Sequence, residues 1–440
     1  MRILVYGGAG GLNSGDEALL RSAVQTINTI APSAGITYFS LNDKLARKTL
    51  SGFDVEYVPS PRSAFFASDP HYWSCDEVFR ARWTELHAAL VGVNLAAALE
   101  TIASSEALSF INRDQARQCL LAIAHCHAVV VHGGGVLSSP TRSRLWEIGL
   151  TVEIAAGLGK RVLLRSHQFG PYSNDEDRAR AQSILRLSAY LSTRDQLQSS
   201  CEASRLVPGV SVVDQVDDAF ILRLEPDVET DTLAEHGLKA GEYICVGYRH
   251  NPSVGVDGEC IEKTARVVSA ARRRLGLPVV LLPQGNFDEP HLNHLASLLD
   301  FETRLIVPRV PIDGTIEIAS NARLMVACPH HSLIFALRGG VAVLSPVMGD
   351  YYKFKNVGSM RLFGLEDSVI DIAPPPDVFM PIVEERLDRI ERNGTAIRTC
   401  LMEKIAALCE TAAQQDGRFA RVLLGADKER PVDGIFLVEG

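Results

Sequence analysis

Two adjacent histidines, His330 and His331, stand where an apolar run gives way to a helical pattern. The run at 324–328 is short enough for a buried strand, Pro329 suits the start of a helix, and Gly339 suits its end. Unpaired backbone N–H groups gather at such a start and favour a bound phosphate or carboxylate. Two imidazoles there could donate protons to the bound group. The pattern predicts an anion site with its own acid; the alternative is a histidine pair that only caps the helix.

Glycines and polar side chains follow the predicted strands of the N-terminal half in the same way. The strand at 2–6 runs into a glycine-rich turn, the strand at 128–131 ends in a three-glycine turn, and two later strands end near Gly170 and Arg194. Ligands of open α/β sheets bind beyond the carboxyl ends of strands. The first turn lacks the G-x-G-x-x-G spacing of a dinucleotide site. The residues expected to line a ligand cleft are Gly10, Gly11, Asn13, Gly15, Asp16, Gly133, Gly134, Gly135, His167 and Gln168.

The elements that would position these groups alternate between strands and helices in two successive runs. This alternation predicts an α/β fold of two Rossmann-like domains facing a central cleft, which is the GT-B arrangement. The expected limits are residues 1–225 for the first domain, 241–375 for the second, and 376–440 for C-terminal helices and a tail. A polar stretch at 225–241 would connect the two domains.

An aromatic-rich segment at 59–83 interrupts the first run. It carries Phe65, Phe66, Tyr72, Trp73, Phe79 and Trp83 among prolines and charged residues. Such a segment either lines a binding cleft or packs an insertion onto its domain. The sequence leaves both readings open.

The composition narrows the class of protein. A chain of 440 residues with 46% hydrophobic and 22% charged residues is too long for one usual core, so two domains are expected. The net charge of −9 and the dispersed basic residues argue against a nucleic-acid partner. Nine scattered cysteines without a C-x-x-C pair indicate a reducing compartment and no structural zinc. Without a signal-peptide pattern or an apolar run of membrane-spanning length, we expect a cytoplasmic protein with no integral membrane segment.

Five short motifs in this order resemble those of the polysaccharide pyruvyl transferase family. The motifs are Asn13-Ser14-Gly15-Asp16-Glu17-Ala18, Gly133-Gly134-Gly135, Gln168-Phe169-Gly170-Pro171, Thr193-Arg194-Asp195 and His331-Ser332-Leu333-Ile334-Phe335-Ala336. The resemblance implies a GT-B-like enzyme that moves pyruvate from phosphoenolpyruvate onto sugar hydroxyls as a ketal. It also implies phosphoenolpyruvate as co-substrate, no cofactor and no metal. The acceptor would be a saccharide, lipid-linked or free, on the first domain, with the donor on the second; homo-oligomerisation stays open.

The resemblance assigns His331 as the general acid that protonates the donor. Donor binding would fall to Arg194, His330 and Ser332, with Lys353 and Arg361 as secondary candidates that surface solvation explains equally well. The family's usual arginine two residues before the histidine is replaced here by Pro329, so another cation must enter the site. The alternatives are a nucleotide-sugar glycosyltransferase on the same fold and a non-catalytic member that binds a glycan or a partner.

Overall fold

Two parallel sheets organise the chain in a computed structural model, which describes residues 1–8, 13–195, 198–224, 232–250, 257–307 and 309–426. The chain divides into two compact units. Unit 1 comprises the described parts of residues 1–11, 19–215 and 413–440, and unit 2 comprises those of 12–18 and 216–412. The division between Gln215 and Val216 precedes the connection expected at 225–241, and the last helix is shared by both units rather than forming a separate part.

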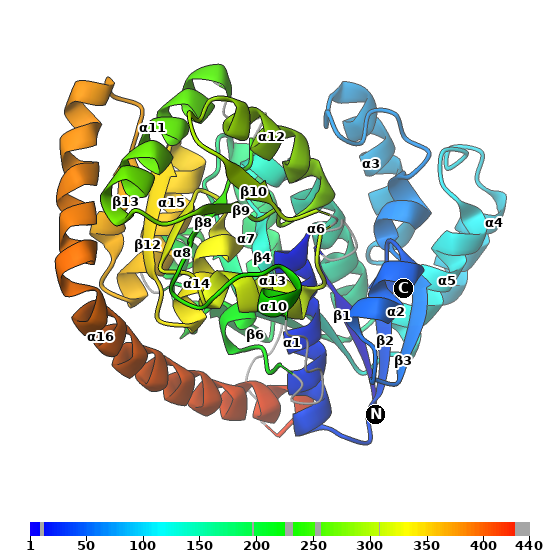
Figure 1. The fold of residues 1–440 in the computed structure, drawn as a ribbon. Helices are drawn as coiled ribbons and strands as arrows, with labels where there is room; N and C mark the ends of the chain where they lie inside the picture. Colours follow the sequence, from blue (N-terminus) through cyan, green and yellow to red (C-terminus); the bar gives the residue numbers. More distant parts are fainter. Residues whose placement is uncertain (9–12, 196–197, 225–231, 251–256, 308, 427–440) are drawn as a thin grey trace. The chain divides into compact units, whose positions relative to one another are not determined.

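Unit 1 holds a seven-stranded sheet in the order β3-β2-β1-β4-β5-β6-β7, with all neighbours parallel (Figure 1). Its strands are β1 (Arg2–Tyr6), β2 (Gly35–Ser40), β3 (Val55–Pro59), β4 (Ala128–Leu137), β5 (Arg161–Phe169), β6 (Tyr190–Thr193) and β7 (Val213–Asp214). Its helices are α1 (Ser14–Ile30), α2 (Asp43–Thr49), η1 (Arg62–Phe66), α3 (Glu77–Leu90), α4 (Leu95–Ser104), α5 (Arg113–His125), η2 (Ser139–Thr141), α6 (Arg142–Gly157), α7 (Asp175–Arg186) and α8 (Gln198–Leu206).

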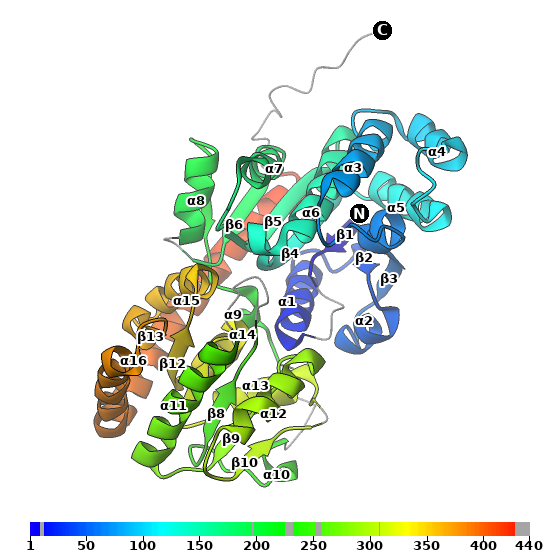
Figure 2. The same cartoon turned by 90° about the horizontal axis from the view of Figure 1, so that it is seen from above.

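The side chains of β1 alternate between two hydrophobic cores, as expected for a central parallel strand. Leu4 and Tyr6 join the core that includes α5 and α6, whereas Ile3 and Val5 join the core that includes α1. Helices α3, α4 and α5 lie together beside this sheet in both views (Figure 2). Helix cover on both faces makes unit 1 a doubly wound domain.

The aromatic segment is mostly part of the core. Phe65, Phe66, Phe79 and Trp83 are buried, and Phe79 and Trp83 pack against Trp146 of α6 with ring centroids 5.7 and 5.3 Å apart. Trp73 stays 62% exposed. The observed packing favours an insertion docked onto the domain over a cleft lining.

Unit 2 holds a six-stranded parallel sheet in the order β10-β9-β8-β11-β12-β13. Its strands are β8 (Ile244–Gly247), β9 (Val279–Leu281), β10 (Thr303–Leu305), β11 (Leu324–Ala327), β12 (Ala342–Val347) and β13 (Val369–Asp371). Its helices are α9 (Asp218–Ile221), α10 (Thr232–Glu235), α11 (Asp257–Leu275), η4 (Asn286–Asp288), α12 (Glu289–Ser297), α13 (Ile312–Ser320), α14 (His330–Arg338), α15 (Asp350–Leu362), η5 (Glu366–Ser368) and α16 (Pro376–Leu424).

Each sheet reverses its strand order once, and the strands that flank the reversal are β1 and β4 in unit 1 and β8 and β11 in unit 2. In doubly wound folds the crevice at this point, beyond the strand carboxyl ends, is where ligands bind. The predicted pair of Rossmann-like domains is therefore confirmed. Within the described residues, no helix is both long enough and apolar enough to cross a membrane.

The three-glycine turn was a wrong prediction, because Gly133, Gly134 and Gly135 continue β4 as far as Leu137. A Cβ on Gly133 would lie 2.2 Å from the carbonyl oxygen of Ser166, so glycine allows β4 and β5 to approach closely. The register between these strands shifts after Gly134. His167 and Gln168, which we expected to line the cleft, lie inside β5 near its carboxyl end.

Two histidines are buried within this part of the unit 1 sheet. The His132 ring packs against Gly7, and neither of its nitrogens has a hydrogen-bond partner among the described residues. The His167 Nε2 atom lies 3.0 Å from the carbonyl oxygen of Val131. Burial lowers the pKa of His132 to about 3 and that of His167 to about 4. Both rings are neutral in the folded protein at neutral pH.

We predict that unit 1 loses stability as the pH falls below about 6.5. Below this pH a histidine binds a proton in the unfolded state, whereas the buried His132 and His167 stay neutral in the folded state. At pH 5 the cost is about 2 kcal/mol for each buried histidine. His132→Leu should therefore reduce the loss between pH 7.5 and pH 5 by about that amount. All three tryptophans lie in unit 1, so urea unfolding followed by tryptophan fluorescence isolates this unit. The exposed His294→Leu is the control, and equal pH sensitivity of both variants would contradict the prediction.

Candidate active site

The predicted histidine pair lies at the start of α14, directly after β11, at the reversal point of the unit 2 sheet. Pro329 precedes the helix in an extended conformation with φ −61° and ψ 126°, and Gly339 follows its last residue. Both histidines are buried, with 2% of His330 and 7% of His331 exposed. The predicted position at a helix N-terminus is confirmed.

One carboxylate, that of Asp217, serves both imidazoles. The Asp217 Oδ2 atom lies 3.1 Å from His330 Nε2 and 3.8 Å from His331 Nε2. Its other oxygen accepts a hydrogen bond of 2.9 Å from the backbone N–H of Ala219 and so caps α9. A buried carboxylate in this position stabilises a proton on either ring. Because Asp217 carries a single negative charge, it compensates for one imidazolium at a time.

The first motif of the chain reaches this histidine pair from 316 residues away in sequence. Residues 13–18 belong to unit 2, and an added Cβ on Gly15 would lie 1.9 Å from Nδ1 of His331. Only a glycine allows the first turn of α1 to lie against the imidazole in this way. Gly15 and Asp16, expected in a loop, thus form the first turn of a helix that begins at Ser14.

Several bonds hold this first turn in place within unit 2. The N–H of Ser14 donates to the carbonyl of Gln284 at 2.7 Å, and Asn13 forms a β-bridge with Gly285. The guanidinium of Arg309 donates to the Ser14 hydroxyl at 2.6 Å and pairs with the buried Glu17 carboxylate at 2.9 Å. Two predicted residues of this segment, Gly10 and Gly11, lie outside the described residues.

Arg249 follows β8, the strand that pairs with β11 on the other side of the reversal point. Its guanidinium makes a bidentate pair with Asp288 at 2.7 and 2.8 Å. Burial lowers the pKa of Arg249, but the hydrogen bonds and charge of Asp288 outweigh it, with smaller contributions from Tyr352 and Asp16, so the net shift is upward. Arg249 was not among the predicted site residues, although it directly follows an apolar run of strand length at 243–248.

Asn356 of α15 ties the strand ends of unit 2 together. Its buried amide donates to the carbonyl of Cys328 and to the hydroxyl of Ser345, each at 2.9 Å. These bonds fix the turn between β11 and the histidines. The sequence carried no signal for Asn356, because its partners come from the turn after β11 and from β12.

Two of the other donor-binding candidates of unit 2 have ion-pair partners, whereas the Ser332 hydroxyl has no hydrogen-bond partner among the described residues. The hydroxyl of Ser332 is buried against Gly247, where an added Cβ would lie 2.7 Å from it. Lys353 and Arg361 form exposed ion pairs with Asp371 at 3.3 Å and with Glu366 at 3.7 Å. These exposed ion pairs favour the interpretation of Lys353 and Arg361 as solvated surface residues.

Arg194 lies in unit 1, at the end of β6, and is 1% exposed. Its guanidinium donates to the side-chain carbonyl of Gln168, and its backbone N–H donates to the carbonyl of His167 at 3.2 Å. Three predicted residues of unit 1 therefore meet at the ends of two neighbouring strands. Their role in donor binding stays a prediction.

Glu147 of α6, a buried carboxylate of unit 1, was also absent from the predicted site residues. It accepts hydrogen bonds from the hydroxyls of Tyr6 and Tyr72 and from Arg144, whose guanidinium also donates to the carbonyl of Gly7 at 2.7 Å. Burial raises the pKa of Glu147 well above its usual value. These bonds hold the start of the glycine turn that follows β1.

The Asp217, His330 and His331 ligand atoms all lie within 4.8 Å of one another, so these three side chains could also hold a divalent metal ion. Zinc accepts imidazole nitrogens and a carboxylate oxygen at 2.0–2.2 Å and would leave one coordination position open. The same geometry suits a carboxylate that orients a proton-transferring histidine. A metal site requires a bound ion for activity, whereas acid catalysis by the histidine does not.

Comparison with known proteins identifies the sequence class and the fold. The profile of a family described as polysaccharide pyruvyl transferase matches residues 13–345. No curated protein matches the sequence. A UDP-GlcNAc 2-epimerase from Neisseria meningitidis, bound to UDP-GlcNAc, is similar in structure with a TM-score of 0.58 at 10% identity, over 97% of this chain and 100% of that one. A UDP-glucosyltransferase from Polygonum tinctorium has a TM-score of 0.55 at 12% identity, over 96% and 98% of the two chains. At these identities the likeness establishes the GT-B fold alone.

We predict that Gly15→Ala displaces the His331 ring, because the added methyl group would occupy the space of the imidazole. Since a misplacement of about 1 Å can cost about a hundredfold in rate, turnover should fall by at least that factor while the fold is retained. Gly417→Ala is the matched control, because an added Cβ there has nothing within 4 Å. The measurement is the initial rate with saturating substrates. A Gly15→Ala rate within about twofold of the control would show that the close contact between Gly15 and His331 does not matter for turnover.

Proposed function

Because the chain belongs to the polysaccharide pyruvyl transferase family, we propose that it transfers pyruvate from phosphoenolpyruvate to a saccharide as a ketal, with His331 as the general acid. The observation that carries the proposal is the meeting of Gly15, Asp217 and His331 within unit 2. It joins the first and last family motifs of the chain at one buried imidazole. In this proposal His331 donates the proton, the Asp217 carboxylate stabilises the charged imidazole, and the N-terminus of α14 binds an anionic group of phosphoenolpyruvate.

The proposed reaction begins with proton transfer from His331 to the terminal vinyl carbon of phosphoenolpyruvate, which leaves an oxocarbenium-like centre on the neighbouring carbon. A first sugar hydroxyl adds to this centre, and its proton returns to the histidine. The C–O bond to phosphate then breaks, and a second hydroxyl adds to the same carbon to complete the ketal. Its proton passes to the departing phosphate, which leaves as inorganic phosphate. Asp217 would stabilise the imidazolium before the first step and again after the first addition.

Charge compensation for the donor requires cations near the histidines, because phosphoenolpyruvate carries a carboxylate and a phosphate. Arg249 is the candidate cation within unit 2: it follows the strand adjacent to β11, interacts electrostatically with Asp16 and pairs with Asp288. Because Asp217 compensates for one imidazolium at a time, a charged His331 leaves His330 as a neutral hydrogen-bonding group in this step. This assignment fills the place of the arginine that Pro329 replaces, and the proposal for Arg194 stands beside it.

A nucleotide-sugar glycosyltransferase is the second candidate function. The observation in its favour is the GT-B fold shared with a UDP-glucosyltransferase and with an epimerase bound to UDP-GlcNAc. A ligand that binds only the folded state raises the melting temperature. Thermal unfolding with phosphoenolpyruvate, and separately with UDP-glucose and UDP-GlcNAc, distinguishes the two functions: stabilisation by a nucleotide sugar alone would overturn the pyruvyl proposal.

We predict that His331→Asn lowers kcat by more than about a hundredfold and leaves phosphoenolpyruvate binding largely intact, because an amide fills the space but transfers no proton. Asp217→Asn should move the alkaline fall of kcat to a lower pH, since the imidazolium loses its carboxylate. His294→Asn, on an exposed position of α12, is the control. Near-normal turnover of a folded His331→Asn protein would return this histidine to a capping role.

Dialysis against EDTA tests whether the site holds a metal ion. Retained activity supports acid catalysis, and a loss of activity that Zn²⁺ restores supports a metal site.

We also predict that both proposed cations contribute to donor affinity. Arg194→Ala should weaken phosphoenolpyruvate binding by at least about tenfold, which is 1.4 kcal/mol. Arg249 must be tested together with its partner, since a buried Asp288 carboxylate without its arginine would destabilise the fold. The double variant Arg249→Gln with Asp288→Asn removes both charges and should also weaken binding by at least about tenfold. Calorimetric titration decides for each cation, and unchanged affinity in either variant removes that arginine from the donor site.

A further inference from the structure

The long helix α16 has a kink at Asn393, where an arginine from outside the helix donates to one of its carbonyl groups. Asn393 departs from helical geometry with φ −119° and ψ 17°. Arg323 donates from Nη2 to the carbonyl of Ile390 at 3.3 Å, the group that Gly394 N–H would bond in a regular helix. An added Cβ on Gly394 would lie 2.2 Å from the Arg323 guanidinium. A side chain inserted into the hydrogen-bond ladder is an established cause of a helix kink.

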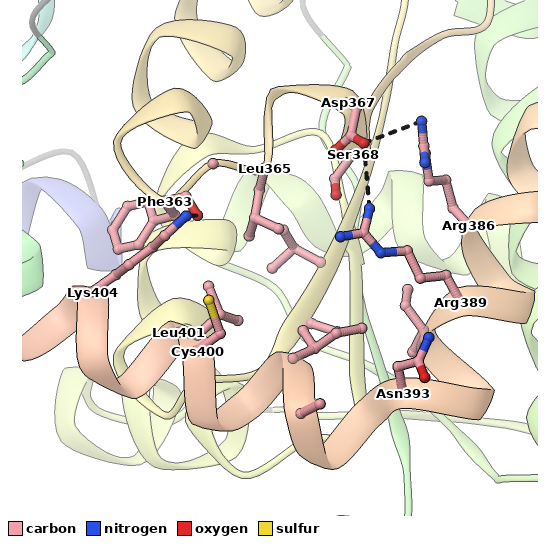
Figure 3. A pocket seen from close by; sticks show the side chains of 16 residues that line it. Phe363, Leu365, Asp367, Ser368, Arg386, Arg389, Asn393, Cys400, Leu401 and Lys404 are labelled. Carbon is pink, nitrogen blue, oxygen red and sulfur yellow. Dashed lines mark hydrogen bonds and ion pairs between the residues drawn. The ribbon is translucent and has the colours of Figure 1, made fainter.

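A cavity of about 300 Å³ lies beside this bend, entirely within unit 2. Figure 3 shows its lining side chains, which come from both halves of α16, the start of β12 and the segment between α15 and β13. The apolar part of the lining consists of Ala342, Val343, Phe363, Leu365, Ile390, Ala396, Ile397 and Leu401. A cavity of this volume stands at the lower end of the range for small-molecule sites.

The charged part of the lining is positive. Arg386 and Arg389 converge on one carboxylate, that of Asp367, at 3.2 and 3.6 Å (Figure 3). Lys404 contributes a third cation and donates to the carbonyl of Phe363 at 2.7 Å. Three cations and one carboxylate line the cavity, and Glu385, which lies 3.4 Å from Arg386, is outside the lining.

Arg386 retains unused hydrogen-bonding capacity at this cavity. Its Nε atom is buried and has no hydrogen-bond partner among the residues that the structure describes. A buried donor without a partner is costly, and a bound oxyanion would satisfy it. Within the lining, the carboxylate of Asp367 faces three cations, Arg386, Arg389 and Lys404, and Glu385 contacts Arg386 from outside the lining. Both observations indicate an anionic ligand group at the arginine end of the cavity.

The cavity and the histidine site lie at opposite ends of neighbouring strands in the same sheet. Ala342, which lines the cavity, is the first residue of β12 and pairs with Leu324, the first residue of β11. His330 and His331 follow the other end of β11. Because β11 and β12 are parallel, the strands separate the two places. The cavity therefore does not belong to the proposed donor site.

We propose that this cavity is a second binding site, for a small amphiphilic anion with a phosphate or carboxylate head and an apolar chain. The head pairs with Arg386 and Arg389, and the chain lies on the apolar lining between α16 and β12. A free anion without the chain gains only exposed ionic contacts, and a neutral chain gains only the apolar contacts. Affinity and selectivity thus require both parts. The site does not depend on pyruvyl transfer.

Cys400 of α16 provides a direct test, because its exposed side chain lines the cavity. Octyl phosphate is the probe, and iodoacetamide alkylation of the full-length protein is followed by mass spectrometry. Cys409 is an internal control on the same helix outside the lining, and trypsin separates the two cysteines at Lys404. Octyl phosphate at ten times its Kd should slow alkylation of Cys400 about tenfold and leave that of Cys409 unchanged.

Paired variants establish where the anion binds. Arg386→Gln with Arg389→Gln should weaken protection by octyl phosphate at least about tenfold. Arg392→Gln, which is exposed on α16 and outside the lining, should leave protection unchanged. His331→Asn should also retain it, so failure of the pyruvyl proposal and failure of this one are distinguishable. Equal protection by 1-octanol or by ethyl phosphate, no protection at Cys400, or full protection in the double arginine variant would each overturn the site.

Discussion

A buried carboxylate that faces two imidazoles is the interaction on which the proposed chemistry depends. Asp217 lies within 4 Å of Nε2 of both His330 and His331, and it also caps the short helix α9. Burying an ionised carboxylate is costly unless charges and hydrogen bonds compensate for it. Here a backbone N–H and two imidazoles provide that compensation. An acid catalyst needs such a carboxylate beside its imidazole, because the negative charge favours the protonated ring.

Glycine at position 15 imposes the second constraint on the same site. The first turn of α1 lies against the His331 ring so closely that no side chain fits between them. The ion pair between Arg309 and Glu17 and the bridge between Asn13 and Gly285 hold that turn in unit 2. The family motifs at the two ends of the matched region are therefore parts of one packed arrangement. This explains physically why a glycine and a histidine so distant in sequence belong to one site.

Parallel sheets account for the placement of the remaining groups. The carboxyl ends of β8 and β11 carry Arg249 and the histidine pair at the reversal point of the unit 2 sheet. The amino end of β12 carries the start of the apolar cavity beside α16. One sheet thus separates a site proposed for chemistry from a site proposed for binding. The separation follows from strand direction alone, since every neighbouring pair in this sheet is parallel.

The sequence by itself determined the local structure: apolar runs of strand length, helical periods between them, and a proline and a glycine at the two ends of α14. These features depend on contacts near in sequence, so the two doubly wound domains and the position of His331 could be predicted. Only the tertiary structure decided which partners the histidines have. Asp217, Arg249 and Asn356 reach the site from separate elements, and no periodicity records such a convergence. The three glycines of β4 failed as a predicted turn for the same reason, because the neighbouring strand, not the local sequence, required them.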